Sequence, residues 1–184
     1  MNRIPKLLTP FNLKIFELLI DENISVRDLA KKIKCSPAKI TQFIKLFKKD
    51  NLIKTSKEKN RKILILNKEN PVIREIISLL FIDKIVTSKT FSGLKKNAKS
   101  IGVYGSVVEG SLDKKSDIDL WVLSDIKIPL VDAGNLRIKM SEELGREVSI
   151  KFFTPKDINN LKKKDGIFYN ELEYKSKIIC GEGF

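Results

Sequence analysis

The stretch from Gly102 to Leu123 constrains the fold of this chain more than any other, because it sets two aspartates into an apolar strand. Residues 117–123 read Asp-Ile-Asp-Leu-Trp-Val-Leu and predict a strand whose alternate side chains share one face. Asp117 and Asp119 therefore point the same way, with their α-carbons about 7 Å apart. Two carboxylates on one face repel each other unless a cation joins them, and Mg²⁺ is the usual oxygen-seeking metal. The sequence thus predicts a metal site at the head of this strand.

A Gly-Ser turn precedes the acidic strand. Residues 101–104 predict a short apolar strand that runs into Gly105 and Ser106, followed by one helical turn over 107–110 and a polar loop. Backbone N–H groups at the start of such a turn, together with a serine hydroxyl, can bind a phosphate. A phosphate site beside a metal-binding carboxylate pair is the chemistry of nucleotidyl transfer.

The pattern Gly-Ser, ten residues, Asp, one residue, Asp resembles the DNA polymerase beta-like nucleotidyltransferase superfamily, in particular its minimal nucleotidyltransferases. The resemblance spans about residues 99–181 and implies a mixed sheet flanked by helices. It implies that Gly105 and Ser106 contact the phosphates of a nucleoside triphosphate, expected to be ATP. It also implies that Asp117 and Asp119 are catalytic and hold two Mg²⁺ ions. The rival interpretation is a surface turn beside an edge strand that happens to carry aspartates.

A third position of that family carries a catalytic aspartate, which helps to deprotonate the attacking hydroxyl. Residues 128–145 predict a helix that ends at a glycine, and the strand after it maps the third position onto Ser149. Serine is neutral and a poor Mg²⁺ ligand. Glu147 on the same strand face is the alternative carboxylate, and Lys151 would either neutralise the aspartates or bind a triphosphate. Nucleotide and metal binding follow from the retained motif, whereas transfer chemistry stays open.

The composition excludes several kinds of site. The 184 residues include no histidine, so Cys/His zinc sites, Ser-His triads and imidazole acid-base chemistry are ruled out. Cys35 and Cys180 have no neighbouring metal ligands and are expected to be small packing residues. No apolar run approaches the roughly 20 residues of a bilayer helix, and no signal peptide pattern opens the chain. We therefore expect a cytoplasmic protein without a membrane partner.

The charge is unevenly distributed along the chain. Residues 1–99 carry 23 basic and 9 acidic side chains, whereas residues 100–184 carry 13 and 14. This asymmetry predicts two modules, the first of which faces a polyanion. The rival interpretation is a lysine-rich composition that only favours solubility.

The basic first half has the order of elements of a known DNA-binding module. A helix over 11–22, a short helix after Ser25, a longer helix after Ser36 and a β-hairpin over 52–69 with a basic tip follow one another. This order resembles the winged helix-turn-helix family over about residues 7–69. The resemblance implies double-stranded DNA as a partner, with the helix after Ser36 in the major groove.

Within that resemblance the expected DNA contacts fall into three groups. Base edges are within reach of the N-terminal part of the helix, phosphates lie near its later lysines, and the hairpin tip reaches the backbone or minor groove. The residues concerned are, in that order, Lys39, Thr41 and Gln42; Lys45, Lys48 and Lys49; and Lys59 and Arg61. The rival interpretations are a solvated helix face and a winged helix that binds protein.

We therefore expect an α+β chain in three parts: a winged helix-turn-helix over 1–69, a helical linker or dimerisation segment over 70–98, and a nucleotidyltransferase-like domain over 99–184. Within the linker, one helix is expected from Pro71 to Phe81 and a second over 82–99. The whole chain resembles prokaryotic proteins that fuse a winged helix to this nucleotidyltransferase fold.

Three functional hypotheses stay open. The first is a DNA-binding regulator whose second domain senses or uses a nucleotide. The second is an antitoxin-like minimal nucleotidyltransferase that transfers a nucleoside monophosphate (NMP) to a partner toxin, a nucleic acid or a small molecule. The third is a nucleotidyltransferase of the antibiotic-modifying kind, for which the sequence shows no separate acceptor-binding domain.

Overall fold

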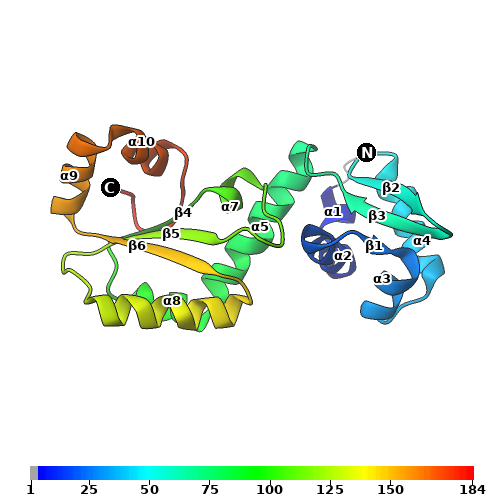
Figure 1. Ribbon diagram of the computed structural model, residues 1–184, viewed down its shortest axis with the longest axis horizontal. Coiled ribbons are helices and arrows are strands. Elements are labelled where there is room, and N and C mark those ends of the chain that lie inside the picture. The colour runs from blue at the N-terminus through cyan, green and yellow to red at the C-terminus, as the bar shows by residue number, and fades with distance from the viewer. Residues whose placement is uncertain (1–3) are drawn as a thin grey trace. The chain divides into compact units, whose positions relative to one another are not determined.

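The computed structural model describes residues 4–184 and divides the chain into two compact units, each described here by itself (Figure 1). One unit ends at Leu80 and the other begins at Phe81, so the division falls inside helix α5 (Pro71–Thr87). Within residues 4–184, every helix is too short or too polar to cross a membrane.

The first unit places short helices before a small antiparallel sheet of order β1-β3-β2. Its helices begin at hydroxyl caps: the side chains of Thr9, Ser25 and Ser36 each accept a hydrogen bond from a backbone N–H three residues later. In chain order its elements before α5 are α1 (Ile4–Leu7), α2 (Pro10–Asp21), β1 (Ile24–Ser25), α3 (Val26–Lys32), α4 (Pro37–Lys48), β2 (Ile53–Glu58) and β3 (Arg61–Leu66).

Aromatic rings form the centre of the first unit. Phe16 of α2 lies 5.5 Å, between ring centroids, from both Phe43 and Phe47 of α4, and these two are 4.7 Å apart. Ile40 and Ile44 are buried on the same face of α4. The apolar stripe read from the sequence is therefore the face that α4 buries, and its polar residues remain exposed.

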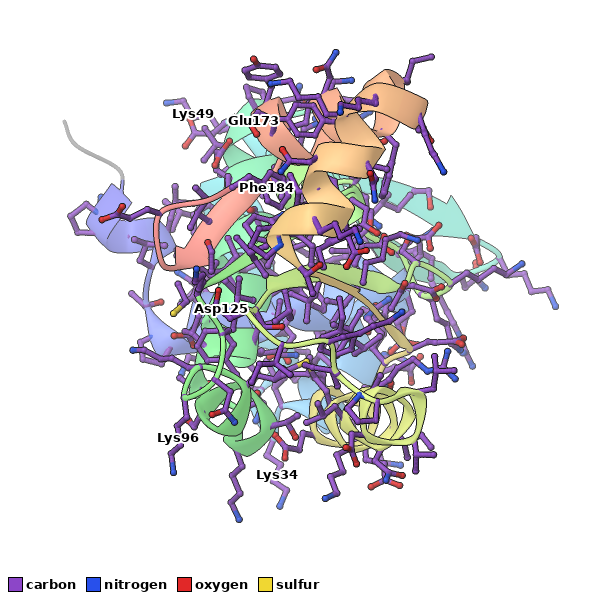
Figure 2. All side chains as sticks on the ribbon, turned by 90° about the vertical axis from the view of Figure 1, so that its left-hand side faces the viewer. Lys34, Lys49, Lys96, Asp125, Glu173 and Phe184 are labelled. Carbon is purple, nitrogen blue, oxygen red and sulfur yellow. The ribbon has the colours of Figure 1, made fainter. Side chains whose placement is uncertain are left out.

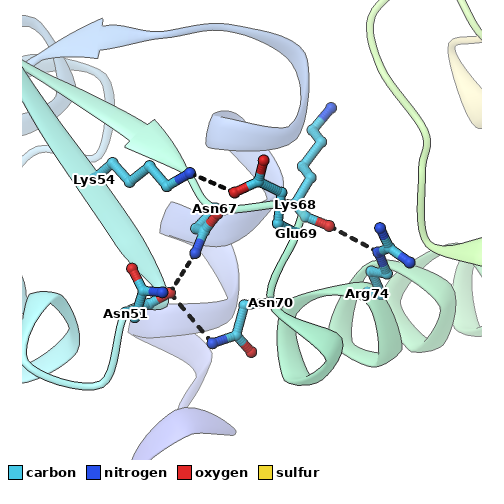
Figure 3. A network of polar contacts seen from close by, with 7 residues as sticks. All are labelled: Asn51, Lys54, Asn67, Lys68, Glu69, Asn70 and Arg74. Atoms are coloured by element: carbon cyan, nitrogen blue, oxygen red, sulfur yellow. Dashed lines mark hydrogen bonds and ion pairs between the residues drawn. The ribbon is translucent and has the colours of Figure 1, made fainter.

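A polar network fixes the chain between β3 and α5 (Figure 3). Asn67 and Asn70 both donate from Nδ2 to the backbone carbonyl of Asn51, at 2.7 and 3.2 Å. Arg74 Nε donates to the carbonyl of Lys68 at 2.8 Å. These bonds satisfy the backbone carbonyls of Asn51 and Lys68, which lie outside helices and strands, and they tie the segment after β3 to the turn before β2.

The segment after Pro71 differs from the two helices expected. Helix α5 continues without a break from Pro71 to Thr87, because Ile77, Phe81 and Ile85 repeat at a spacing of four and are all buried. The break comes at Ser88, whose side chain caps the short helix α6 (Lys89–Leu94). The expectations of a break after Phe81 and of a second helix reaching residue 99 are therefore wrong.

The second unit is built on a mixed sheet of order β6-β5-β4-β7, in which only the β5–β6 pair is parallel. The expected mixed sheet flanked by helices is therefore confirmed. Its elements after α6 are β4 (Ser100–Tyr104), α7 (Ser106–Glu109), β5 (Ile118–Leu123), α8 (Leu130–Leu144), β6 (Val148–Phe153), α9 (Pro155–Lys164), α10 (Gly166–Tyr174) and β7 (Lys177–Cys180).

Helices cover both faces of this sheet, with α8 on one side and α9 and α10 on the other (Figure 1). Trp121 is 1% exposed and anchors the side under α9 and α10, where Gly102 leaves room for the indole. Phe184, which is labelled in Figure 2, packs on the same indole, at 4.4 Å between ring centroids. Because side chains alternate along β5, Asp119 lies on this same face of the sheet.

Candidate active site

Gly105 forms the sharp turn between β4 and α7. Its backbone has φ 66° and ψ −141°, a conformation that L side chains rarely adopt. A β-carbon at this position would lie 3.0 Å from Oδ2 of Asp119. Backbone conformation and close approach therefore both require glycine, and the turn lies directly against the acidic strand.

Ser106 joins the two ends of the loop that follows the turn. Its hydroxyl donates to the backbone carbonyl of Asp117 at 3.3 Å, although the two residues are eleven positions apart in sequence. The N–H groups of Val108 and Glu109 donate to the carbonyl of Gly105, at 3.0 and 3.1 Å, and close the single turn of α7. The Gly-Ser turn is therefore a fixed feature of the site.

The two aspartates lie at the start of β5 and interact electrostatically. Asp117 is exposed just before the strand, and Asp119 is half-buried opposite Tyr104 of β4. Burial raises the pKa of Asp119, and the charge of Asp117 raises this pKa further. Lys151 opposes the effect, but the shift remains upward. A cation near this pair would stabilise the ionised carboxylates.

The neighbouring strand β6 brings Ser149 to the acidic pair. Ser149 lies opposite Asp119 in the parallel register, and its hydroxyl donates a hydrogen bond to Asp119 that lowers the pKa of this carboxyl. Glu147 comes just before β6 and is exposed, with its backbone carbonyl accepting from Ile118 N at 2.9 Å. Of the two candidates for the third position, the structure thus brings the neutral one to Asp119.

Helix α10 contributes residues that the sequence pattern did not mark. Phe168 lies 6.1 Å from Tyr104 in an edge-on ring contact, and the Nζ of Lys151 lies 5.3 Å from the Phe168 ring. Burial raises the pKa of Tyr104, and the charges of Asp119 and Glu171 add to this shift. No local signal identifies these residues, because α10 reaches the site by tertiary packing about 50 residues after the motif.

Arg146 holds the loop that leads into the acidic strand. Its Nη1 donates to the backbone carbonyl of Asp113, and to that of Ser116 at 3.1 Å. The guanidinium carbon also lies 5.1 Å from the centre of the Phe81 ring. Arg146 therefore fixes the chain immediately before Asp117.

The donor set fits Mg²⁺ held jointly with a nucleotide. Asp117 and Asp119 offer two carboxylates on one face, and Mg²⁺ usually takes one or two carboxylates together with phosphate oxygens and waters. Among residues 4–184, no group of three or more His, Cys, Asp or Glu side chains is placed to hold a metal by itself. Phosphate oxygens of a bound nucleotide and waters would complete the coordination.

The residues expected to contact DNA lie exposed on α4 and the hairpin. Gln42 and Lys45 are exposed, whereas Lys39 places its Nζ 4.1 Å from the centre of the Phe11 ring. The Thr41 hydroxyl donates to the carbonyl of Pro37 at 3.0 Å, within its own helix.

The hairpin tip is a two-residue turn with Lys59 at φ 52°. Arg61, directly after this turn, lies 3.9 Å from Asp28. Lys48 donates to Thr55 Oγ1 at 3.0 Å, and Lys49 is exposed at the end of α4. The structure thus leaves a basic surface, part of which is already engaged within the unit.

Comparison with known proteins adds one family and several distant folds. Residues 87–182, more than half of the chain, match the family described as Polymerase beta, Nucleotidyltransferase. No curated protein matches the sequence. One similar structure is a crystal structure of a toxin-antitoxin with AMP-PNP. It is 20% identical in sequence, the match covers 55% of this chain and 73% of that chain, and the TM-score is 0.43. Another is the structure of tri-AMPylated Shewanella oneidensis HEPN toxin in complex with MNT antitoxin. It is 18% identical in sequence, the match covers 57% of this chain and 73% of that chain, and the TM-score is 0.40.

Proposed function

Because this chain belongs to the polymerase beta nucleotidyltransferase family, we propose that its second unit binds a nucleoside triphosphate and transfers the NMP to an acceptor hydroxyl. The supporting observation is the approach of the Gly-Ser turn to the acidic strand, where a β-carbon on Gly105 would lie 3.0 Å from Asp119. Nucleotidyl transfer needs a phosphate-binding backbone and a metal-binding carboxylate pair in contact. The second unit offers both.

Each residue of the site has a proposed role. Gly105 and Ser106 would receive the triphosphate of ATP, and Asp117 and Asp119 would hold up to two Mg²⁺ ions. Bound Mg²⁺ would supply neutralisation of phosphate charge and orientation of the leaving group. Lys151 lies near enough to affect the pKa of Asp119 and would pair with a phosphate oxygen.

The acceptor is proposed to be a hydroxyl of a partner protein. The minimal nucleotidyltransferases that the sequence resembles include antitoxins that modify a partner toxin, and the retained turn and aspartates are the features shared with them. A nucleic acid or small-molecule hydroxyl remains the alternative acceptor.

The test follows label from the α-phosphate of ATP in the presence of Mg²⁺. Label should pass to a co-expressed partner or to the chain itself, and Asp119→Asn should abolish the transfer. Asp125→Asn is the matched control, because Asp125 lies on the same unit but pairs on the surface with Lys99 at 2.6 Å (Figure 2). If wild-type protein binds ATP in calorimetry but labels no acceptor, the site senses a nucleotide and the enzymatic proposal is wrong.

A second candidate function is DNA binding by the first unit. We propose that α2, α3, α4 and the β2–β3 hairpin form a winged helix-turn-helix. The observation in its favour is that α4 buries Ile40, Phe43, Ile44 and Phe47 and leaves Gln42 and Lys45 exposed. A helix with this polar outer face, followed by an exposed basic hairpin, suits a major groove and an adjacent backbone.

Selection from a random duplex library tests this second function. Wild-type protein should enrich a sequence motif, and Gln42→Ala should relax the preference for adenine at one position. A lost bidentate contact corresponds to about 1–3 kcal/mol of discrimination. Lys14→Ala, exposed on α2, is the control and should leave the motif unchanged. Failure of the wild type to retain any duplex would refute the proposal.

A further inference from the structure

Helix α10 packs on the face of the sheet that carries Asp119. Leu172 of α10 is 1% exposed and belongs to the same buried cluster as Tyr104 and Trp121. Tyr104 lies opposite Asp119 in the register of β4 and β5, and Trp121 is two residues after Asp119 on the same strand. This part of α10 therefore packs on the sheet next to the strand neighbours of Asp119.

Phe168 and Glu171 occupy neighbouring positions on one side of α10, because they are three residues apart. The Phe168 ring contacts Tyr104 at 6.1 Å and lies 5.3 Å from the Nζ of Lys151. The side of α10 that carries Phe168 thus faces Tyr104 at the end of β4 and Lys151 of β6, and Glu171 lies one helical turn after Phe168 on that side.

Electrostatics agree with this placement. Burial is the main cause of the raised pKa values of Asp119 and Tyr104, and the charge of Glu171 adds to both. Asp119 and Tyr104 lie opposite each other on adjacent strands, so an effect on both agrees with the position that the Phe168 contacts give to this side of α10. Glu171 is half-buried, which also sets it apart from the exposed Glu147.

We propose that Glu171 supplies the carboxylate that β6 lacks and accepts the proton of the attacking hydroxyl. This inference rests on the proposed transferase function. The acceptor oxygen forms a bond to the α-phosphorus of ATP, the bond from that phosphorus to the β-phosphate bridging oxygen breaks, and pyrophosphate leaves. The hydroxyl proton passes to Glu171. Ser149, the neutral residue opposite Asp119, has no carboxylate with which to take this proton.

The proposal divides the acidic groups of the site by role. Asp117, just before β5, and Asp119, within it, would hold the metal and, through it, the phosphates. Glu171 comes from helix α10, about 50 residues after the aspartates in sequence, and among residues 4–184 no group of three acidic side chains is placed to hold a metal. A carboxylate near the pair but outside a joint metal cluster is suited to proton transfer.

The experiment measures pyrophosphate release from MgATP with water as the acceptor, together with labelling of the chain itself by α-labelled ATP. Glu171→Gln should lower both rates about 100-fold or more, the usual size of a general-base contribution. The affinity for MgATP in calorimetry should change less than twofold. The matched control is Glu173→Gln, because Glu173 is exposed on the same helix (Figure 2).

A second variant separates a chemical role from a structural one. Ser149→Asp places a carboxylate opposite Asp119, and in the Glu171→Gln background it should restore much of the transfer rate. Undiminished transfer by Glu171→Gln would overturn this inference alone. Loss of MgATP affinity in Glu171→Gln, or failure of Ser149→Asp to restore any of the transfer rate, would show that Glu171 has only a structural role. Either result would also overturn the inference. Absence of any transfer by the wild type would overturn the proposed function, and this inference with it.

Discussion

At the scale of single residues, Gly105 is the position at which one methyl group most directly disturbs the site. Its φ of 66° and ψ of −141° disfavour any L side chain, by about 1–3 kcal/mol. The added β-carbon would also press on Asp119 Oδ2 at 3.0 Å. We expect Gly105→Ala to lower the free energy of unfolding by at least this amount and to weaken MgATP binding, as measured by urea unfolding and calorimetry.

Gly134 provides the matched control for that variant. It lies inside helix α8, and a β-carbon there meets no atom within 4 Å. Gly134→Ala should raise the free energy of unfolding by up to about 1 kcal/mol, because alanine is the better helix former. Equal destabilisation by both substitutions would show that the close approach to Asp119 has no special effect.

The charge of Asp119 opposes folding at neutral pH. Its pKa is raised in the folded protein, chiefly by burial and then by Asp117, so the folded state binds the proton more tightly than the unfolded state does. Without metal, stability should therefore fall as pH rises through the raised folded pKa. Asp119→Asn should be more stable than wild type at pH 7 in urea unfolding with chelator present.

The same sign argument fixes the controls for this prediction. Below the ordinary pKa of an aspartate both states are protonated, so the advantage of Asp119→Asn should vanish toward pH 3. Saturating Mg²⁺ with ATP should also reduce the difference in the free energy of unfolding between Asp119→Asn and wild type, because a bound cation stabilises the ionised wild-type pair. An Asp119→Asn advantage that grows as pH falls would contradict the assigned direction of the pKa shift.

At the scale of elements, Arg146 links the end of α8 to the loop before β5. Its Nη1 donates to the carbonyls of Asp113 and Ser116, which a single lysine ammonium cannot reach with the same planar geometry. Arg146→Lys should loosen residues 111–116, raise their amide hydrogen exchange and weaken MgATP binding severalfold. Arg137→Lys, exposed on the same helix, is the control and should change neither measurement.

Sequence reasoning succeeded for elements whose signals are local. The side chains of Thr9, Ser25 and Ser36 cap helices as their residue types predict, and the hairpin turns within its predicted basic tip. The predicted helix boundaries after Pro71 were wrong, because continuous apolar spacing carries α5 through Phe81 and no local signal before Ser88 ends it. Helix boundaries in apolar runs depend on packing partners that a single sequence does not display.

The residues of the candidate site were likewise predictable only where a local motif identifies them. Gly105, Ser106 and the two aspartates follow from one short motif, because the strands that carry them are adjacent in sequence and in the sheet. The sequence also placed Ser149 near the aspartates, because β6 is the next strand along the chain. It did not place Glu171 or Phe168 there, since their position depends on how α10 packs over Tyr104 and Trp121. Tertiary packing of that kind leaves no spacing pattern in the chain.

At the scale of the whole molecule, the charge asymmetry supports a division of labour between the two units. Residues 1–80 carry 18 basic and 8 acidic side chains, and residues 81–184 carry 18 and 15. Many basic residues of the first unit are exposed on α4 and at the hairpin tip, so they add to its positive field. A polyanion should therefore bind through the more strongly basic first unit, and the proposed nucleotide site belongs to the less charged second unit.

Salt dependence of duplex binding tests this division. Each phosphate contact contributes about 0.9 to the slope of log affinity against log salt, so replacing both Lys59 and Arg61 by alanine should flatten the slope by up to about 2. Because Arg61 already lies 3.9 Å from Asp28, we expect the change in slope to fall in the lower part of that range. Lys163→Ala with Lys164→Ala, on α9 of the second unit, removes equal charge. If that control flattens the slope as much as the hairpin variant, binding follows net charge alone and the hairpin has no specific role.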